Sequence, residues 1–156
     1  MADKFFKTRY YDDLNVGDTW RTNTKTITAT DMVLFNSMLG IALPAFVDEE
    51  YMKEGTIFGR RFATGVMTIP LAAGLFTQLH LLDDSLMAML GMDCKMKKPL
   101  FAGDTIYVDV EVVDKKETSK LDRGVVHFRY LTKNQREEIL AEITEIIMVK
   151  RIQEQL

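Results

Sequence analysis

Apolar and polar residues alternate regularly along two stretches in the second half of the chain, at positions 105–112 and 124–132. The apolar members are Ile106, Val108, Val110 and Val112 in the first stretch and Val126, Phe128 and Tyr130 in the second. Successive side chains of a β-strand point to opposite faces of its sheet, so this alternation is typical of a strand with one buried face. We therefore predict two long strands here, each turning its apolar side toward a core.

Two further stretches extend this set of strands. The first, 86–100, alternates lysine with methionine before Pro99 ends the run. The second, 137–151, has a composition that also suits a helix, but its β-branched residues and the turn-like segment 132–138 favour a strand. A threonine-rich run within 16–32 is expected to be a short strand or an extended arm. Together these stretches predict an antiparallel meander.

A different pattern lies at positions 62–82, where the chain is apolar nearly all round. The segment is about as long as a membrane-spanning helix, but polar side chains interrupt it and charged segments flank both ends. A helix that is apolar all round also occurs in protein cores, and we favour that interpretation. We expect it to begin at Gly65 or Thr68, to run to about Leu82, and to carry Pro70 in its first turn.

Two smaller helices are predicted before this long one. Apolar residues recur at helical spacing over 32–39, where Thr30 or Asp31 is placed to cap the helix. Asp48 precedes a second helix over 49–55, whose acidic first turn suits the helix dipole.

An antiparallel sheet with one apolar face needs an apolar layer to cover it. The long helix is the element best suited to that place, so we predict an α+β fold in which the sheet wraps around a long central apolar helix. This is the hot-dog architecture. The length of 156 residues suits a single such domain over 1–156.

Composition narrows the possible functions. The chain has 20 Lys and Arg against 23 Asp and Glu, so it lacks the basic field that nucleic-acid binding requires. Cys94 is the single cysteine, which excludes an intrachain disulfide and a cysteine-rich metal site. The first residues contain no apolar run typical of a secretory signal. We expect a cytoplasmic protein without a membrane, metal or nucleic-acid partner.

The order of three motifs then becomes informative: "VDEEY", "FGRRFATG" and "PLFAGDT". With their flanking segments they resemble the MaoC-like hot-dog proteins, the family of (R)-specific enoyl-CoA hydratases and related dehydratases, from about Tyr11 to Lys150. The resemblance implies hydration of a trans-2-enoyl thioester. In the family an Asp and a His hold the water and move its proton, and a backbone N–H at the start of the central helix polarises the thioester carbonyl.

The stretch "GIALPAFVDEEY" departs from the family at the residues that carry this chemistry. Gly40 and Pro44 match the pattern G-D-x-N-P-x-H, but Ile41 takes the place of the aspartate, Leu43 that of the asparagine and Phe46 that of the histidine. Neither isoleucine nor phenylalanine can transfer a proton. We expect the loop to be buried against the central helix and the hydratase activity to be largely lost, with no catalytic residue assigned.

The resemblance also implies a set of substrate-binding residues. Gly65 is expected to present the carbonyl-binding N–H, although it could equally be a packing glycine, and Thr64 stands where many members carry another histidine. Leu43 would line the site. Arg60 and Arg61 would bind the phosphates of coenzyme A, as would the lysines at 95, 97 and 98. Apart from a coenzyme A thioester as substrate or ligand, no cofactor is implied.

Other residues carry weaker signals. Asp48, Glu49 and Glu50 could supply the carboxylate of a hot-dog thioesterase, although capping a helix explains them better. His80, near the end of the long helix, and His127, in a strand, are expected in solvated positions rather than in a catalytic or metal site.

Three hypotheses therefore remain: a protein that binds an acyl thioester without hydratase chemistry, an active hydratase or thioesterase with substitute groups, or a non-catalytic partner of a homologue that keeps the Asp and His. An exposed edge strand invites association, so we expect a homodimer or a higher oligomer, or a hetero-oligomer with such a homologue.

Overall fold

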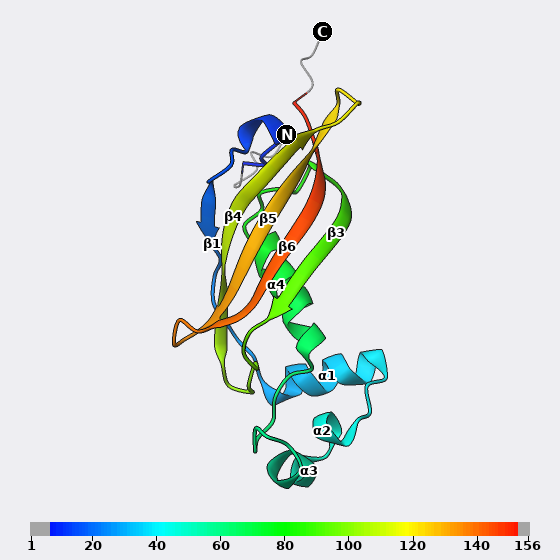
Figure 1. Ribbon diagram of the computed structural model, residues 1–156, viewed down its shortest axis with the longest axis vertical. Coiled ribbons are helices and arrows are strands. Elements are labelled where there is room, and N and C mark those ends of the chain that lie inside the picture. Colours follow the sequence, from blue (N-terminus) through cyan, green and yellow to red (C-terminus); the bar gives the residue numbers. More distant parts are fainter. Residues whose placement is uncertain (1–6, 153–156) are drawn as a thin grey trace.

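The computed structural model describes residues 7–152 (Figure 1). The helical elements are η1 (Tyr11–Asp13), α1 (Ala29–Leu39), α2 (Pro44–Val47), α3 (Glu49–Glu54), η2 (Gly65–Met67) and α4 (Thr68–Thr77). The strands are β1 (Thr19–Arg21), β2 (Lys25–Thr26), β3 (Leu86–Met96), β4 (Thr105–Glu117), β5 (Arg123–Asn134) and β6 (Ile139–Lys150).

The strands form one antiparallel sheet in the order β1-β4-β5-β6-β3, and β2 also pairs with β4. The four long strands lie where the alternation of residues predicts them, including β6, whose composition also suits a helix. Figure 1 shows α4 lying behind the curved sheet, so the predicted α+β arrangement of a sheet around a helix is confirmed.

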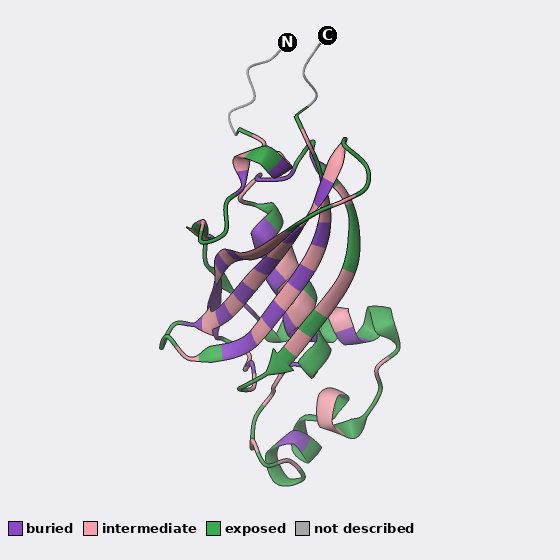
Figure 2. Ribbon diagram, turned by 45° about the horizontal axis from the view of Figure 1, so that its top comes forward, coloured by how far each residue is buried: buried purple, intermediate pink, exposed green. Residues whose placement is uncertain are grey.

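The core lies between α4 and the concave face of the sheet. Figure 2 shows buried and half-buried residues in alternating bands along the central strands. The seven apolar residues singled out on β4 and β5 are all buried, which confirms the predicted inner face. Phe76 of α4 packs on two of them, with ring centroids 5.2 Å from Phe128 and 5.1 Å from Tyr130.

The central helix is shorter than the sequence suggests. It was expected to run to about Leu82, but α4 ends at Thr77. Here the Thr77 hydroxyl donates to the Gly74 carbonyl, the next three N–H groups bond three residues back, and His80 adopts a left-handed φ of 55°. The apolar pattern continues past this point because Leu81 and Leu82 are buried outside the helix. Pro70 lies in the first turn, as predicted.

No helix in residues 7–152 is long and apolar enough to cross a membrane. The helical part of 62–82 is η2 and α4, and Ala72, Leu75 and Phe76 of α4 are buried, as the buried-helix interpretation predicts.

The two smaller helices have well-defined first turns. Asp48 caps α3, because its Oδ1 accepts the N–H groups of Glu50 at 2.9 Å and Tyr51 at 3.1 Å, as predicted. The predicted cap of α1 is wrong by two or three residues, since Thr28 is the N-cap. Asp31 completes a capping box by accepting the Thr28 N–H at 2.8 Å.

Helices α1 to α3 project from one end of the sheet (Figure 1). The loop of 40–47 was expected to be buried against the central helix, and for a single chain this expectation is wrong. Leu43 is 62% exposed, Val47 is also exposed, and Ile41 and Phe46 are half-buried. Part of the loop forms α2, with Pro44 at its first position, a favourable place because a helix start requires no bonded N–H there.

Candidate functional site

The start of the central helix offers an unpaired backbone donor. The N–H of Gly65 makes no hydrogen bond with any described residue. A Cβ placed on Gly65 would meet no atom within 4 Å, and its φ is not in the left-handed region. Neither close packing nor backbone strain therefore requires glycine at this position. An N–H without a protein partner, at a residue with open space beside it, could donate to a ligand carbonyl.

Gly65 lines a pocket of about 280 Å³. Its walls come from the segment before η2, from the start of α4 and from the end of β3 with the loop that follows. The lining residues are Phe58, Phe62, Ala63, Gly65, Thr68, Met96, Lys97, Lys98, Pro99 and Leu100. The two segments are held together where the Ala63 N–H donates to the Leu100 carbonyl at 2.8 Å. The pocket is thus mostly apolar, with two lysines at its wall.

An aromatic cluster connects this pocket to Phe46, the residue expected from the resemblance to stand at the histidine position of the family pattern. Phe46 packs edge-on against Phe62 with ring centroids 5.2 Å apart, and Phe62 also contacts Phe58 at 4.6 Å. Phe58 and Phe62 both line the pocket. Phe46 is therefore one side chain removed from the pocket of Gly65, whereas the exposed Leu43 and the half-buried Ile41 are not among its lining residues.

Thr64 lies next to Gly65 at the start of η2 and contacts α1. Its side chain is buried, is not among the lining residues of the pocket, and directs its hydroxyl to Oδ1 of Asn36 at 3.4 Å. Asn36 is itself buried although it belongs to the projecting helix α1. The pair fastens α1 to the start of the central helix. In the sequence, the signal for this contact was the position of Asn36, a polar residue on the apolar face of the helix predicted over 32–39.

The two arginines are engaged with protein groups. The Arg60 guanidinium lies over the ring of Phe101, 3.6 Å from its centroid. The Arg61 guanidinium is ion-paired with Glu49. Neither arginine lines the pocket. Arg61 therefore ties the connection before η2 to α3, a structural role that the sequence did not indicate.

The two lysines at the pocket wall, Lys97 and Lys98, differ in their ion pairing. Lys98 is ion-paired with Glu138 at 2.7 Å, whereas Lys97 has no ion-pair partner among residues 7–152. Lys95 points to the other face of β3, opposite Glu142. Lys97 is thus the unpaired cation of the pocket.

The carboxylates considered as substitutes are all occupied. Asp48 caps α3, Glu49 is bound by Arg61, and Glu50 pairs with Lys53 at 2.7 Å. This arrangement supports the capping interpretation over a thioesterase carboxylate.

The histidines and the cysteine do not join the pocket. His80 Nδ1 lies 3.0 Å from Oδ2 of Asp83, and His127 is half-buried on the sheet face opposite α4. Burial, with Asp93 nearby, raises the pKa of the Cys94 thiol, which disfavours the reactive thiolate. No group of three or more His, Cys, Asp or Glu side chains within 7–152 could hold a metal ion.

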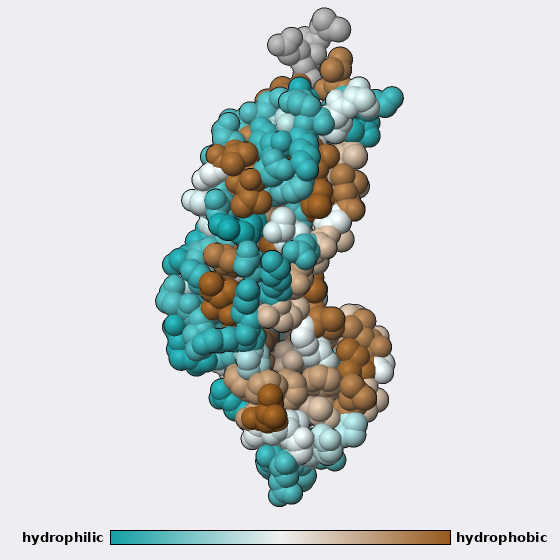
Figure 3. Space-filling model, viewed as in Figure 1, coloured by the Kyte–Doolittle hydropathy of each residue, from teal (hydrophilic) through white to brown (hydrophobic). Residues whose placement is uncertain are grey.

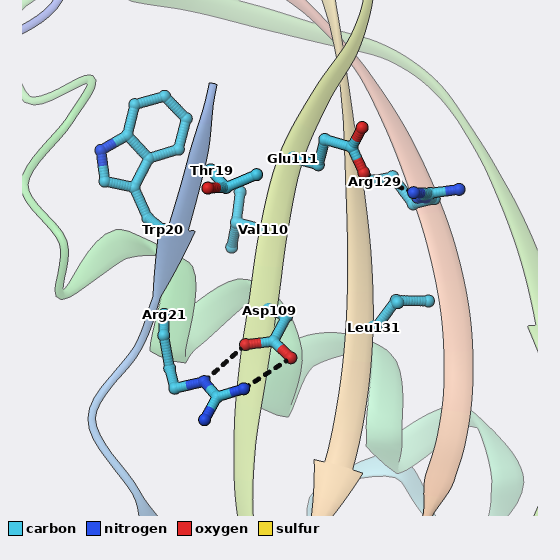
Figure 4. Close-up of a pocket in the computed structure, with 8 residues that line it drawn as sticks. All are labelled: Thr19, Trp20, Arg21, Asp109, Val110, Glu111, Arg129 and Leu131. Atoms are coloured by element: carbon cyan, nitrogen blue, oxygen red, sulfur yellow. Dashed lines mark hydrogen bonds and ion pairs between the residues drawn. The ribbon is translucent and has the colours of Figure 1, made fainter. Parts of the chain in front are cut away.

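A second cavity, of about 340 Å³, lies on the sheet face opposite α4 (Figure 4). Its charged groups neutralise one another: Arg21 donates to both oxygens of Asp109, at 2.6 and 3.0 Å, and Arg129 is ion-paired with Glu111. The Arg21 guanidinium, with Lys133 beside it, holds the pKa of Asp109 below its usual value. This cavity lies on the far side of the sheet from Gly65, so we place the candidate site at the pocket of Gly65.

The sequence analysis did not predict the buried carboxylate of Glu145. Glu145 lies on the buried face of β6, where the Tyr130 hydroxyl donates to its Oε2 at 2.7 Å. Glu142 and Glu145 are three positions apart, and residues at an odd spacing point to opposite faces of a strand. That spacing was the signal that one of the two carboxylates would be interior.

Comparisons with known proteins bear on the family and the fold of this chain. The model of the MaoC like domain matches residues 13–134. Protein MaoC of Klebsiella aerogenes is 32% identical over 117 residues, which are 74% of this chain but only 33% of that protein. The chain therefore spans about a third of the length of that curated relative.

Two solved structures show the same fold. The monoamine oxidase regulatory protein of Archaeoglobus fulgidus is 28% identical, with a TM-score of 0.87 over 94% of this chain and 97% of that one. The (R)-hydratase of A. caviae involved in PHA biosynthesis is 24% identical, with a TM-score of 0.67 over 89% of this chain and 98% of that one. The predicted hot-dog fold is confirmed. The chain belongs to the MaoC-like domain family.

Proposed function

We propose that this protein binds an acyl thioester of coenzyme A at the pocket of Gly65 and hydrates 2-enoyl thioesters poorly or not at all. The observation that carries the proposal is the unpaired N–H of Gly65 in an open, mostly apolar pocket. A backbone donor at this place suits the thioester oxygen, and the apolar walls suit the carbon chain.

The phosphates of coenzyme A need cations near the pocket. Lys97 is the best candidate because it lines the pocket and is unpaired among the described residues. Lys98, Arg60 and Arg61 are already engaged with protein groups, so their contribution would require exchange of a partner. We therefore assign the main electrostatic contact to Lys97 rather than to the two arginines expected from the sequence.

The weak hydratase activity follows from the groups near the pocket. Ile41 and Phe46 stand where the family pattern has its proton-transfer residues, and the aromatic cluster fills the space beside Phe62. General acid–base catalysis contributes a factor of about 10² to 10⁴. The nearby carboxylates Asp48 and Glu49 are held by a helix N-terminus and by Arg61, so they are poor substitutes.

We further propose that the protein functions as a dimer. β3 is an 11-residue strand at the edge of the sheet, with no partner strand on its outer side in residues 7–152. Figure 3 shows apolar side chains gathered along this edge and over α1, with a hollow between them. The exposed apolar residues there are Leu86, Met89, Leu90 and Met96 on β3 and Val33, Leu34, Met38 and Leu39 on α1. A second chain would cover both groups.

A second candidate function rests on the same surface. The partner chain could be a homologue that keeps the Asp and His, in which case this protein would be a non-catalytic subunit. The absence of acid–base groups at Ile41 and Phe46 is compatible with that role. Binding of acyl-CoA by the purified protein alone distinguishes the two proposed functions, because a non-catalytic subunit with no ligand of its own would not bind acyl-CoA.

Isothermal titration calorimetry with acyl-CoA of several chain lengths tests the proposal. We expect binding by the wild type and at least about tenfold weaker binding by Lys97→Ala, because a cation contact to phosphate is lost. Lys95→Ala is the matched control, since this neighbouring lysine lies on the face of β3 opposite Met96 and does not line the pocket. Failure of every acyl-CoA to bind, or equal losses in both variants, would count against the site.

A further inference from the structure

Two phenylalanines line the pocket of Gly65, and each keeps part of its side chain accessible. Phe58 and Phe62 are half-buried, whereas Phe128 in the core is fully buried. A side chain that served only to fill the core would be enclosed in the same way. The accessible part of the two pocket rings is therefore a surface that a ligand in the pocket can cover.

These rings belong to a series of edge-to-face contacts. The ring centroids of Phe58 and Phe62 lie 4.6 Å apart, with their planes at 63°. The series continues from Phe62 to Phe46 at 5.2 Å and from Phe58 to Phe101 at 5.8 Å. Aromatic rings favour this geometry because the positive edge of one ring meets the negative face of the next. A further ring in the pocket can extend the series, whereas a saturated group cannot.

Backbone contacts hold the aromatic wall in place. Phe62 forms an antiparallel β-bridge with Phe101. Next to the bridge, the Ala63 N–H donates to the Leu100 carbonyl at 2.8 Å. The wall is thus formed by the fold itself, and a preformed surface lowers the entropic cost of binding a ligand.

The remaining walls and the volume of the pocket also suit an aromatic ring. Met96 lines the pocket and is 45% exposed. The sulfur of a methionine makes favourable contacts with aromatic rings. An apolar cavity of about 150 Å³ is large enough to bind benzene. The pocket of about 280 Å³ therefore has room for a six-membered ring beside a thioester carbonyl at Gly65.

We propose, on the basis of the acyl-thioester function above, that the acyl group carries an aromatic ring, which packs against Phe58 and Phe62 while the thioester carbonyl lies at Gly65. An alkyl chain in this pocket gains only the burial of its apolar surface. An aromatic ring gains in addition the edge-to-face contact with the two phenylalanines and the contact with the Met96 sulfur.

Calorimetry with matched pairs of coenzyme A thioesters tests this selectivity. One pair is benzoyl and cyclohexanecarbonyl, and the other is hydrocinnamoyl and its cyclohexyl counterpart, so the distance from carbonyl to ring is varied as well. The saturated ring has the larger apolar surface, so burial alone would favour it. We expect the aromatic member to bind about fivefold tighter in at least one pair, because the aromatic contacts add to burial.

Three variants identify the surface that binds the ring. Phe58→Leu and Phe62→Leu each keep an apolar side chain but remove a ring, and we expect each to reduce the aromatic preference to about twofold or less. Phe46→Leu is the matched control, because Phe46 belongs to the same series but does not line the pocket. It should keep the wild-type preference. Circular dichroism checks the fold of each variant.

The outcomes separate this inference from the proposed function. If the wild type binds the cyclohexyl member equally well or more tightly in both pairs, the inference is overturned and the proposed function stands. A preference that Phe58→Leu and Phe62→Leu both retain, or that Phe46→Leu loses to the same extent, would also overturn it. If no acyl-CoA binds, hexanoyl-CoA included, both fail.

Discussion

The sheet with α4 and the projecting segment of α1 to α3 use apolar residues in opposite ways. In the first region the large side chains are enclosed, and Phe76 packs between Phe128 and Tyr130. In the second region Leu34, Met38 and other large apolar residues are exposed in the single chain. The sheet and α4 form a self-sufficient core, whereas the projecting segment and the β3 edge have surfaces that a second chain or a ligand would complete.

The contrast between the two regions can be tested first by truncating one large apolar side chain in each of them and comparing the loss of stability. Phe76→Ala should lower the free energy of unfolding by about 3–5 kcal/mol, because it leaves a cavity between helix and sheet. Met38→Ala, at a side chain that is 75% exposed, should change it by less than about 0.5 kcal/mol in dilute protein. Urea unfolding of both variants measures the difference. Similar losses in dilute protein would show that α1 is packed as firmly as the core.

A second test addresses the β3 edge directly. Leu90→Lys places two charges at the proposed dimer contact, so the dissociation constant should rise by about a hundredfold or more. Sedimentation equilibrium gives this constant, and circular dichroism checks that the fold is kept. Leu121→Lys is the control, because Leu121 is also exposed, at 88% against 50% for Leu90, but lies in the turn between β4 and β5. A wild type that is monomeric at micromolar concentration would contradict the dimer.

A smaller effect is expected from pH, at the turn that supports the pocket wall. Hydrogen bonds from Lys98, then Asn134 and Arg136, lower the pKa of Glu138 to about 2. The pKa of Glu138 in the unfolded chain is about 4.3. Its folded pKa is the lower one, so its contribution to stability is present above about pH 4 and is lost as pH falls toward 2.

Glu138→Gln should therefore flatten the dependence of stability on pH between about 4 and 2, and should lower stability slightly at pH 7. Chemical unfolding across this range is the measurement, with Glu142→Gln as control, since Glu142 has no ion-pair partner in residues 7–152. Identical pH profiles for the wild type and Glu138→Gln would contradict the assignment.

Much of the fold could be predicted from the sequence because burial imposes a period of two on strands. The alternation at Ile106 to Val112 places four side chains on one face, and each is buried. The acidic start at Asp48 likewise identifies its helix, since the capping bonds are local. The end of α4 could not be predicted, because Leu81 and Leu82 are buried for reasons of tertiary packing and so continue the apolar pattern beyond the helix.

The candidate site was predictable only in part. Gly65 was identified through the family resemblance, and the open space around it required coordinates. The expected role of Arg61 in phosphate binding could not be checked from sequence, because its partner Glu49 lies twelve residues away in another element. Lys97 and Lys98 look equivalent along the chain. They differ because a long-range ion pair to Glu138 occupies one of them.

The hydration of crotonyl-CoA by the purified protein tests the central claim, that the family site is kept without its proton-transfer residues. We expect negligible turnover, because Ile41 and Phe46 cannot hold or move a proton and the neighbouring carboxylates are engaged. The loss of the enoyl absorbance with time gives the rate directly. Turnover on the order of 10 per second, an ordinary enzymatic rate, would contradict the account and would require another residue near Gly65 to carry the chemistry.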